Sequence, residues 1–180
     1  MLDEKRLILE LKQGEKEALR RIYMEYKDNL LTIAVSLLHD THTAEDVLHD
    51  VFVTFAGSIG NINLRGSLKS YLTASIVNRV RDMYRKKKHL EVELEEAGQI
   101  AVDSEGPMQT VEFGEQAKRL TDALALLPIE QRETIVLHLK GGMKFKEISL
   151  LLKIPLSTVQ GRYRYGLDKL RVIFNESANK

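Results

Sequence analysis

The segment from residue 145 to residue 170 reads FKEISLLLKIPLSTVQGRYRYGLDKL, and it constrains the fold more than any other part of the chain. Proline does not continue a helix, so the chain is expected to turn at Lys153-Ile154-Pro155. On both sides of this break apolar residues recur at helical spacing, first as Ile148, Leu151 and Leu152, and then as Val159, Tyr163, Leu167 and Leu170. Two short amphipathic helices joined by such a turn are typical of a helix-turn-helix.

The second of these helices carries polar residues between its apolar ones, namely Gln160, Arg162, Arg164 and Lys169. A helix that reads DNA needs this division, because one stripe packs on its own domain while the opposite face reaches base edges and phosphates. The pattern therefore favours DNA binding. It leaves open an ordinary helical hairpin with a solvated basic face, since charged outer faces are common on surface helices.

The rest of the chain also has helical periodicity, and no run alternates in the manner of a half-buried strand. The sequence therefore predicts an all-α fold. Thr43-Ala44-Glu45-Asp46 resembles a capping box and predicts a helix that begins at Thr43, while Ser67 predicts the start of a helix that ends in the basic run 85–88. The expected helices before the helix-turn-helix cover residues 3–12, 16–38, 43–55, 67–88, 113–127 and 129–140.

Charge divides the chain into three blocks. Residues 90–112 contain seven acidic residues and no basic one, whereas the blocks on both sides are net basic, although the whole chain has a net charge of only +1. This segment also has few apolar residues, so it cannot bury a core of its own against the entropy of ordering. We expect two small helical domains, residues 1–89 and 113–180, joined by a flexible acidic linker at 90–112 that is mobile in the free chain.

Composition argues against several functional classes. The absence of cysteine excludes disulfides, thiolate metal sites and a cysteine nucleophile, and it suits a reducing cytoplasm. No apolar run is long enough to span a bilayer and the N-terminus lacks a signal peptide pattern, so membrane insertion is not expected. The five histidines do not pair with carboxylates at a metal-ligand spacing. We expect no catalytic residues, no metal and no cofactor.

Four motifs, in order along nearly the whole chain, indicate a family. They are AEDVLHDVFVTF at 44–55, GSLKSYLTASIVNRVRDMYRKKK at 66–88, LPIEQRETIVL at 127–137 and STVQGRYRYGLDKLR at 157–171. The set resembles the extracytoplasmic function (ECF) group of bacterial RNA polymerase sigma factors. The resemblance implies that the chain binds core RNA polymerase and directs promoter-specific initiation of transcription. The first domain would recognise and melt the minus-10 element, and the second would read the minus-35 element.

The resemblance implies that the helix at 44–55 docks on core polymerase. Its candidate contacts, Asp46, His49 and Asp50, lie at i, i+3 and i+4 and so share one helix face, away from the apolar Val47 and Val51. A basic partner surface would complement the two acids. The residues alone leave open a solvated acidic face.

The loop at 60–66 resembles the loop that captures a flipped base in this family, and the helix after it would follow the DNA backbone. Glycines allow close backbone approach, and amide and guanidinium groups can bond a base edge. The loop residues alone also fit a plain connector with turn-forming asparagines. The candidate minus-10 contacts are Asn61, Asn63, Arg65, Lys69, Asn78, Arg79, Arg81, Arg85 and Lys86.

The resemblance places the minus-35 contacts on the second helix of the helix-turn-helix. They are Thr158, Gln160, Gly161, Arg162, Arg164 and Tyr165. Arginine can bond guanine O6 and N7, and glutamine can bond adenine N6 and N7. Gly161, Tyr165 and Gly166 depart from the family's usual Ser, Arg and Ala, so the element read can differ from that of relatives. Lys144 replaces the usual capping Ser or Thr, which predicts fraying or a substitute cap.

One alternative function fits the helix-turn-helix equally well: a one-component transcriptional regulator with an N-terminal helical sensor or dimerisation domain. The first domain distinguishes the two, because a regulator does not need the motif at 44–55, the Gly/Asn loop and the basic run together. The expected partners are therefore core RNA polymerase and promoter DNA. The resemblance leaves open an anti-sigma factor as a further partner, and an acidic linker that either enters a basic nucleic-acid channel or is a solvated spacer.

Overall fold

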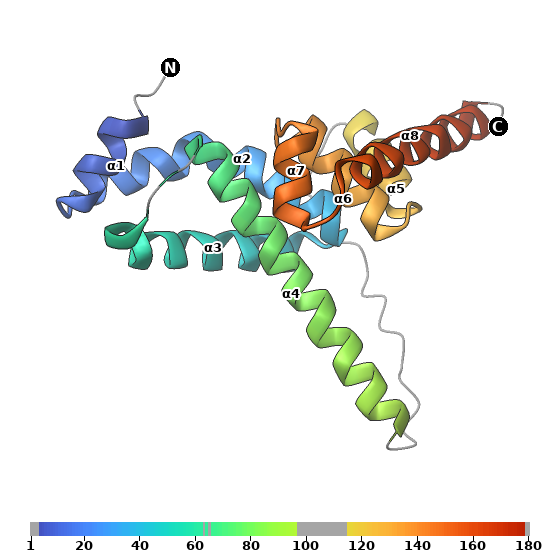
Figure 1. The fold of residues 1–180 in the computed structure, drawn as a ribbon, viewed down its shortest axis with the longest axis horizontal. Coiled ribbons are helices and arrows are strands. Elements are labelled where there is room, and N and C mark those ends of the chain that lie inside the picture. Colours follow the sequence, from blue (N-terminus) through green and yellow to red (C-terminus); the bar gives the residue numbers. More distant parts are fainter. Residues whose placement is uncertain (1–3, 63, 65, 97–114, 179–180) are drawn as a thin grey trace.

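The computed structural model describes residues 4–62, 64, 66–96 and 115–178, and all regular structure in these ranges is helical, as the sequence predicted. The elements, coloured along the chain in Figure 1, are α1 (Glu4–Lys12), α2 (Lys16–Leu38), α3 (Thr41–Ser58), a 3-10 turn η1 (Ile59–Asn61), α4 (Leu68–Glu96), α5 (Glu115–Ala125), α6 (Ile129–Leu139), α7 (Phe145–Leu152) and α8 (Leu156–Ala178). We call α1–α4 the first unit and α5–α8 the second unit.

Helix α2 is the centre of the first unit, because it packs against α1, α3 and α4. Its residues Ile22, Leu30 and Ile33 are fully buried, and Tyr23 stacks edge-on against Phe52 of α3 with ring centroids 4.9 Å apart. Burial of one such aliphatic side chain contributes roughly 1.5–3 kcal/mol. The helical periodicity predicted from the sequence thus corresponds to helices that bury an apolar face in this core.

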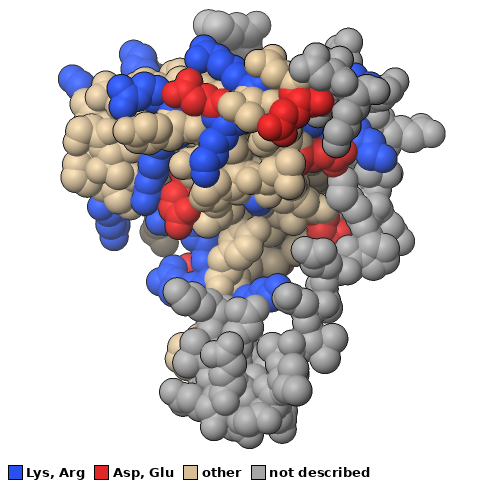
Figure 2. Space-filling model, turned by 90° about the vertical axis from the view of Figure 1, so that its right-hand side faces the viewer, with Lys and Arg blue, Asp and Glu red and all other residues tan. Residues whose placement is uncertain are grey.

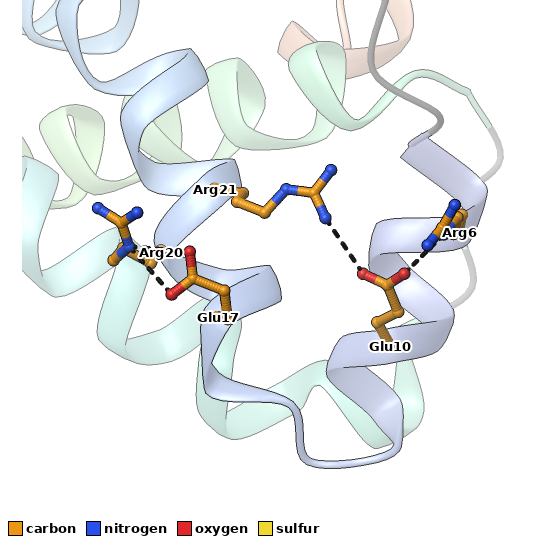
Figure 3. A network of polar contacts seen from close by, with 5 residues as sticks. All are labelled: Arg6, Glu10, Glu17, Arg20 and Arg21. Atoms are coloured by element: carbon orange, nitrogen blue, oxygen red, sulfur yellow. Dashed lines mark hydrogen bonds and ion pairs between the residues drawn. The ribbon is translucent and has the colours of Figure 1, made fainter.

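Helix α1 is fastened to α2 and α4 by carboxylates. Glu10 accepts a hydrogen bond from Arg6 in its own helix at 2.7 Å and forms an ion pair with Arg21 of α2 at 3.5 Å, while Glu17 pairs with Arg20 within α2 (Figure 3). Glu4 accepts at 2.8 Å from the Tyr26 hydroxyl and, also at 2.8 Å, from the backbone N–H of Leu68. An acidic group at the first turn of a helix complements its dipole. Glu4 therefore helps to fix the start of α4.

The predicted start of the third helix was wrong. Helix α3 begins at Thr41, and its N-cap is Asp40, whose carboxylate accepts from the backbone N–H groups of His42 at 3.3 Å and Thr43 at 3.1 Å. The hydrogen bond from the Thr43 hydroxyl, followed by these backbone bonds, lowers the pKa of Asp40. Thr43 therefore lies inside the helix, because an aspartate cap outcompetes the weaker box that begins at threonine.

The fourth helix begins where the sequence predicted and ends later. Ser67 accepts from the N–H of Ser70 at 3.1 Å, so it is the N-cap of α4. The helix continues past Lys88 to Glu96, because nothing at 89–96 breaks it and alternating acids do not prevent helix formation. The first part of the expected linker is therefore helical, while the rest of it, 97–112, lies outside the described residues.

The helix-turn-helix is present as α7 and α8, with Lys153 between them in a left-handed conformation at φ 55°. The ammonium group of Lys144 does not cap the helix, because it cannot accept a hydrogen bond. Instead Glu147 accepts from the backbone N–H of Lys144 at 2.7 Å. This is the substitute cap that the sequence predicted as one of two outcomes, and it is the returning half of a capping box.

The two units pack against each other, because α2 of the first unit contacts both α5 and α6 of the second. Buried residues of both units belong to one continuous apolar cluster. In Figure 1 the second unit lies beside the C-terminal end of α2, and the far end of α4 projects away from the body. The surfaces of the two units are consequently not independent in this state.

Candidate nucleic-acid interface

The three predicted polymerase contacts share the outer side of α3. Asp46 and His49 are exposed and Asp50 is half-buried, while Val47 and Val51 point into the core. Asp50 forms a close ion pair with Arg79 of α4, which is one of the predicted minus-10 contacts. A hollow between α3 and α4 lies next to this pair, lined by Thr54, Tyr71 and Asn78 among others. The structure therefore brings together two residues that were predicted to bind different partners.

The predicted base-capturing loop is described only in part. Asn61 is exposed at the end of η1, whereas Asn63 and Arg65 lie outside the described residues. The ammonium group of Lys12 donates to the carbonyl of Ile62 at 3.1 Å, so α1 anchors the start of the loop. Leu64 is half-buried against the core, and the loop is therefore held at its apolar residues while Asn61 faces solvent.

The remaining minus-10 candidates follow α4. Asn78, Arg79, Arg81, Arg85 and Lys86 are exposed and Lys69 is half-buried. Three of the arginines already have carboxylate partners, since Arg79 pairs with Asp50, Arg81 with Glu133 of α6 at 3.3 Å, and Arg85 with Asp82. Phosphate oxygens would compete for the same guanidinium groups, so DNA binding at α4 requires exchange of these partners.

Helix α8 presents the predicted minus-35 contacts on one side. Val159 and Leu170 are buried, whereas Thr158, Gln160, Arg164 and Tyr165 are exposed, and Gly161 and Arg162 are half-buried. Arg164 donates to the Tyr165 hydroxyl at 3.3 Å, and its guanidinium lies 5.0 Å from the centre of the tyrosine ring. A cation over an aromatic face is weakly attracted to it. Tyr165 therefore restricts the directions in which Arg164 can point.

Figure 2 views the molecule from the right-hand side of Figure 1, where α8 ends. Lys and Arg lie mainly over the upper and left parts of the described surface in that view, with Asp and Glu among them. Such a surface attracts a polyanion, and the attraction is screened by salt.

The two unusual glycines of α8 have different surroundings. A Cβ on Gly166 would lie 2.7 Å from Cδ1 of Ile135, so the absence of a side chain lets α8 approach α6 closely. A Cβ on Gly161 would meet only the Tyr165 ring, at 3.9 Å. No contact with its described neighbours thus requires a glycine at position 161. The missing side chain leaves room on the face that carries the candidate DNA contacts.

Arg132 of α6 is the most extensively bonded side chain at the contact between the units. It is only 8% exposed, and within the second unit it donates to the carbonyls of Leu124 at 2.8 Å, Ala125 at 2.7 Å and Leu127 at 3.0 Å. Its fourth bond crosses to the first unit, where the carbonyl of Leu37 at the end of α2 accepts at 3.0 Å. Burial lowers the pKa of Arg132. The guanidinium nevertheless remains charged, and the four carbonyl acceptors satisfy its donors.

Two further groups meet Arg132 at this point. The Tyr84 hydroxyl of α4 donates to the same Leu37 carbonyl at 3.1 Å, and His39 lies just after α2 in a left-handed conformation at φ 57°. Burial, and then the charge of Arg132, lowers the pKa of His39 to about 4. A neutral imidazole therefore lies beside the buried guanidinium at neutral pH.

Glu133 lies next to Arg132 in sequence and is 5% exposed. Burial raises its pKa, and the charges of Arg81 from α4 and Arg162 from α8 act in the opposite direction. The carboxylate thus pairs with one predicted minus-10 residue, Arg81 at 3.3 Å, and also feels the charge of one predicted minus-35 residue, Arg162. Asn29 of α2 adds a longer bond across the same contact, donating to the carbonyl of Lys140 at 3.4 Å.

Sequence reasoning missed Arg132, Glu133 and His39 as residues that join the units. One general signal was present: residues 129–139, IEQRETIVLHL, divide poorly into an apolar and a polar face, which is typical of a helix covered all round, and the structure buries residues 132–137 consecutively. A short helix of that kind that contains Arg-Glu indicates buried, paired charge. Among the described residues there is no cluster of His, Asp or Glu that could hold a metal ion, and no described helix is suited to crossing a membrane.

Comparison with known families gives two matches in the order of the two units. A model described as Sigma-70 region 2 matches residues 22–90, and one described as Sigma-70, region 4 matches residues 117–170. Together they cover more than half of the chain. The chain is also 28% identical to the ECF RNA polymerase sigma factor SigW of Bacillus subtilis (strain 168) over 176 residues, which is 93% of this chain and 94% of that protein.

Two solved structures have the same fold. One is the structure of CnrH in complex with the cytosolic domain of CnrY, with a TM-score of 0.68 and 20% identity, and it covers 96% of this chain and 97% of that one. The other is the sigma factor RpoE in complex with the anti-sigma factor NepR from Bartonella quintana, with a TM-score of 0.67 and 19% identity, and it covers 87% of this chain and 96% of that one.

The environment of His39 predicts that acid weakens the folded, packed state. The pKa of His39 is about 4 in this state against an ordinary value of 6.5, so between these values the unfolded chain binds a proton that the folded chain does not. The stabilising contribution is complete above about pH 6.5 and is lost as the pH falls toward 4. Urea unfolding of the wild type and of His39→Asn, which tolerates the left-handed backbone, should differ in pH dependence over this window.

His49→Asn is the matched control, because it removes an exposed histidine on the outer side of α3, away from Arg132. Equal slopes of unfolding free energy against pH in the wild type and His39→Asn would contradict the assignment.

Proposed function

The chain belongs to the extracytoplasmic function group of RNA polymerase sigma factors, and we propose how its residues divide the work of that group. It binds core RNA polymerase and directs promoter-specific initiation of transcription. We assign polymerase docking and minus-10 recognition to residues 1–89, minus-35 recognition to 113–180 and the connection to 90–112. The cytoplasm, where polymerase and the chromosome meet, is the compartment in which this activity takes place.

The observation that carries the function is the presence of both units in order, each with a surface suited to its partner. A regulator that acts without polymerase would use the helix-turn-helix of α7 and α8 alone. It would not need the acids of α3 beside the basic groups of α4, and the match to region 2 over residues 22–90 disfavours that alternative.

We assign docking on core polymerase to Asp46, His49 and Asp50. Asp46 and His49 are exposed on α3, so a basic partner surface can reach them without unfolding the helix. The pairing of Asp50 with Arg79 supports a link between docking and DNA binding. A cation from polymerase that bonds Asp50 would release Arg79 toward a phosphate.

Contact with the minus-10 element is assigned to Asn61, Asn63 and Arg65 for the bases, and to α4 for the backbone. Asn78, Arg81, Arg85 and Lys86 are exposed along α4 with Arg79, and Lys69 lies near its N-terminal end. Residues 78–86 span about two helical turns, and this spacing suits successive phosphates of one strand. No catalytic group or cofactor enters this mechanism, because binding energy opens the duplex.

For the minus-35 element, Gln160, Gly161, Arg164 and Tyr165 are assigned to the major groove, and Thr158 and Arg162 to phosphates. The exposed, outward position of Gln160 and Arg164 on α8 supports base readout. The half-buried position of Arg162 supports a backbone contact near the edge of the helix.

An anti-sigma factor is a further proposed partner. The support comes from relatives, since RpoE with a similar fold was solved in complex with the anti-sigma factor NepR, and CnrH with the cytosolic domain of CnrY. A protein of that kind would control when this chain reaches core polymerase.

Removal of the α3 acids should weaken polymerase binding without unfolding the chain. We expect Asp46→Ala with Asp50→Ala to lower the affinity for core polymerase by roughly tenfold, about 1.4 kcal/mol, through the loss of charge complementarity. Calorimetry with core polymerase measures the affinity, and circular dichroism checks the fold. Glu45→Ala is the control, because Glu45 is exposed on the same helix one position away from Asp46 and faces another direction. An unchanged affinity of the correctly folded double variant would refute the docking assignment.

Arg164→Ala should relax base preference at one position of the minus-35 element. The expected loss of promoter affinity is about 1–3 kcal/mol, as for removal of a bidentate base contact. Arg162→Ala should instead weaken binding to all sequences alike. Selection of holoenzyme-bound promoters from a library randomised in that element measures both effects. Arg171→Ala, which removes an exposed arginine of α8 paired with Asp168, is the matched control. An identical consensus for Arg164→Ala and the wild type would exclude Arg164 as a base reader.

A further inference from the structure

Helix α1 contacts both ends of the loop to which base capture is assigned. The loop follows η1, and α1 packs beside η1 at the left of Figure 1. At the start of the loop, the ammonium group of Lys12 donates to the carbonyl of Ile62 at 3.1 Å. After the loop, the carboxylate of Glu4 accepts from the backbone N–H of Leu68 at 2.8 Å. One helix thus restrains the segment 62–68 from both sides.

Helix α1 is itself fixed to the body of the first unit. Its Leu7 is buried in the core, and Glu10 pairs with Arg21 of α2 at 3.5 Å (Figure 3). Glu4 and Lys12 stand about two turns apart on this anchored helix, roughly 12 Å along its axis. The two bonds to the loop therefore start from points whose separation is set by a rigid element.

The bond from Glu4 to α4 is directed by a second donor. The other carboxylate oxygen of Glu4 accepts from the Tyr26 hydroxyl of α2 at 2.8 Å. Burial, and then the hydrogen bond to Glu4, raises the pKa of Tyr26, so its hydroxyl stays protonated at neutral pH and continues to donate. Because α2 holds one oxygen, the other points at the first turn of α4. Glu4 thus sets where α4 begins relative to α2.

The two bonds to the loop contribute more to its position than to the stability of the fold. Lys12 is exposed and Glu4 is half-buried, and a hydrogen bond that water can replace adds little net stability. A restraint on both ends of a loop, however, reduces the conformational freedom that the loop loses when it binds a ligand. A loop held in this way would bind an unstacked base more tightly than a free loop of the same sequence.

The match to Sigma-70 region 2 begins at residue 22, so α1 precedes the matched residues. We propose that α1 is a brace for base capture, in which Glu4 and Lys12 are positioning residues that hold the two ends of the loop. Neither residue touches DNA in this role, because both act through the backbone, at Leu68 and Ile62. The ligand of the loop is an unstacked base of the minus-10 element. The role of the brace rests on the proposed assignment of base capture to this loop.

Two substitutions each release one end of the loop. Lys12→Ala removes the donor at its start, whereas Glu4→Gln leaves one acceptor oxygen for two donors. Lys12→Arg keeps a donor of similar reach and is the conservative rescue. The matched controls are Lys5→Ala, at an exposed lysine of the same helix, and Glu25→Gln, at an exposed glutamate next to Tyr26.

Each variant is bound to core polymerase, and its affinity is measured for a promoter fragment whose minus-10 element is single-stranded and abasic at one position at a time. In the wild type, the abasic site at the captured position should lower the affinity on the order of tenfold. In Lys12→Ala and Glu4→Gln this penalty should fall to roughly threefold, because a loop free at one end holds the base less tightly. Lys12→Arg and both controls should keep the wild-type penalty.

The affinity for a duplex minus-35 fragment separates positioning from general damage to the fold, and it should be the same in every variant. An unchanged abasic penalty in both Lys12→Ala and Glu4→Gln would overturn the brace. An equal loss of affinity at every minus-10 position and for the minus-35 fragment would overturn it as well. If Glu4→Gln does not fold, Lys12→Ala decides the test, since Lys12 is exposed. A wild type without a penalty at any position would instead refute base capture itself, which is the failure of the proposed function.

Discussion

The bond from the buried Arg132 guanidinium to the end of α2 is the interaction on which the observed arrangement depends. Three of the hydrogen bonds of Arg132 go to carbonyls at and just after the end of α5, and they hold α5 against α6. The fourth hydrogen bond attaches the second unit to the first. A buried cation tolerates no missing acceptor, because an unpaired charge in the interior costs far more than a neutral group. The geometry of the two helix ends is therefore fixed together, and with it the placement of α4 beneath the turn after α6.

The fold could be predicted from the sequence because its signals are local. Helical periodicity gave the all-α class and the helix-turn-helix, and Ser67 marked the start of α4 as expected. The start of α3 was misplaced, since two overlapping caps compete at residues 40–46 and the stronger, Asp40, precedes the box. The continuation of α4 to Glu96 was missed, because acidic composition was interpreted as a loss of structure where it is compatible with a helix.

The contact between the units could not be predicted, because it depends on tertiary geometry. Nothing in the local sequence says that Arg132 meets a carbonyl of residue 37, or that Glu133 meets Arg81. The same limit applies to the candidate site. Periodicity places Asp46 and Arg164 on outward faces, and both are exposed in the structure. Periodicity does not reveal, however, that Asp50 and Arg79 form an ion pair with each other. Charged residues that a sequence assigns to two separate partners can pair internally when neither partner is bound.

Transcription in vitro with core RNA polymerase from the chain's own source tests directly whether the chain directs promoter-specific initiation. Core polymerase alone and core polymerase with this chain would be compared on a library of promoters from that genome, with transcript starts mapped by sequencing. The chain should add a defined set of transcript starts that share one pair of upstream elements. Promoter binding by the chain with no new starts at any promoter of the library would contradict it, and would favour a regulator that acts without docking on polymerase.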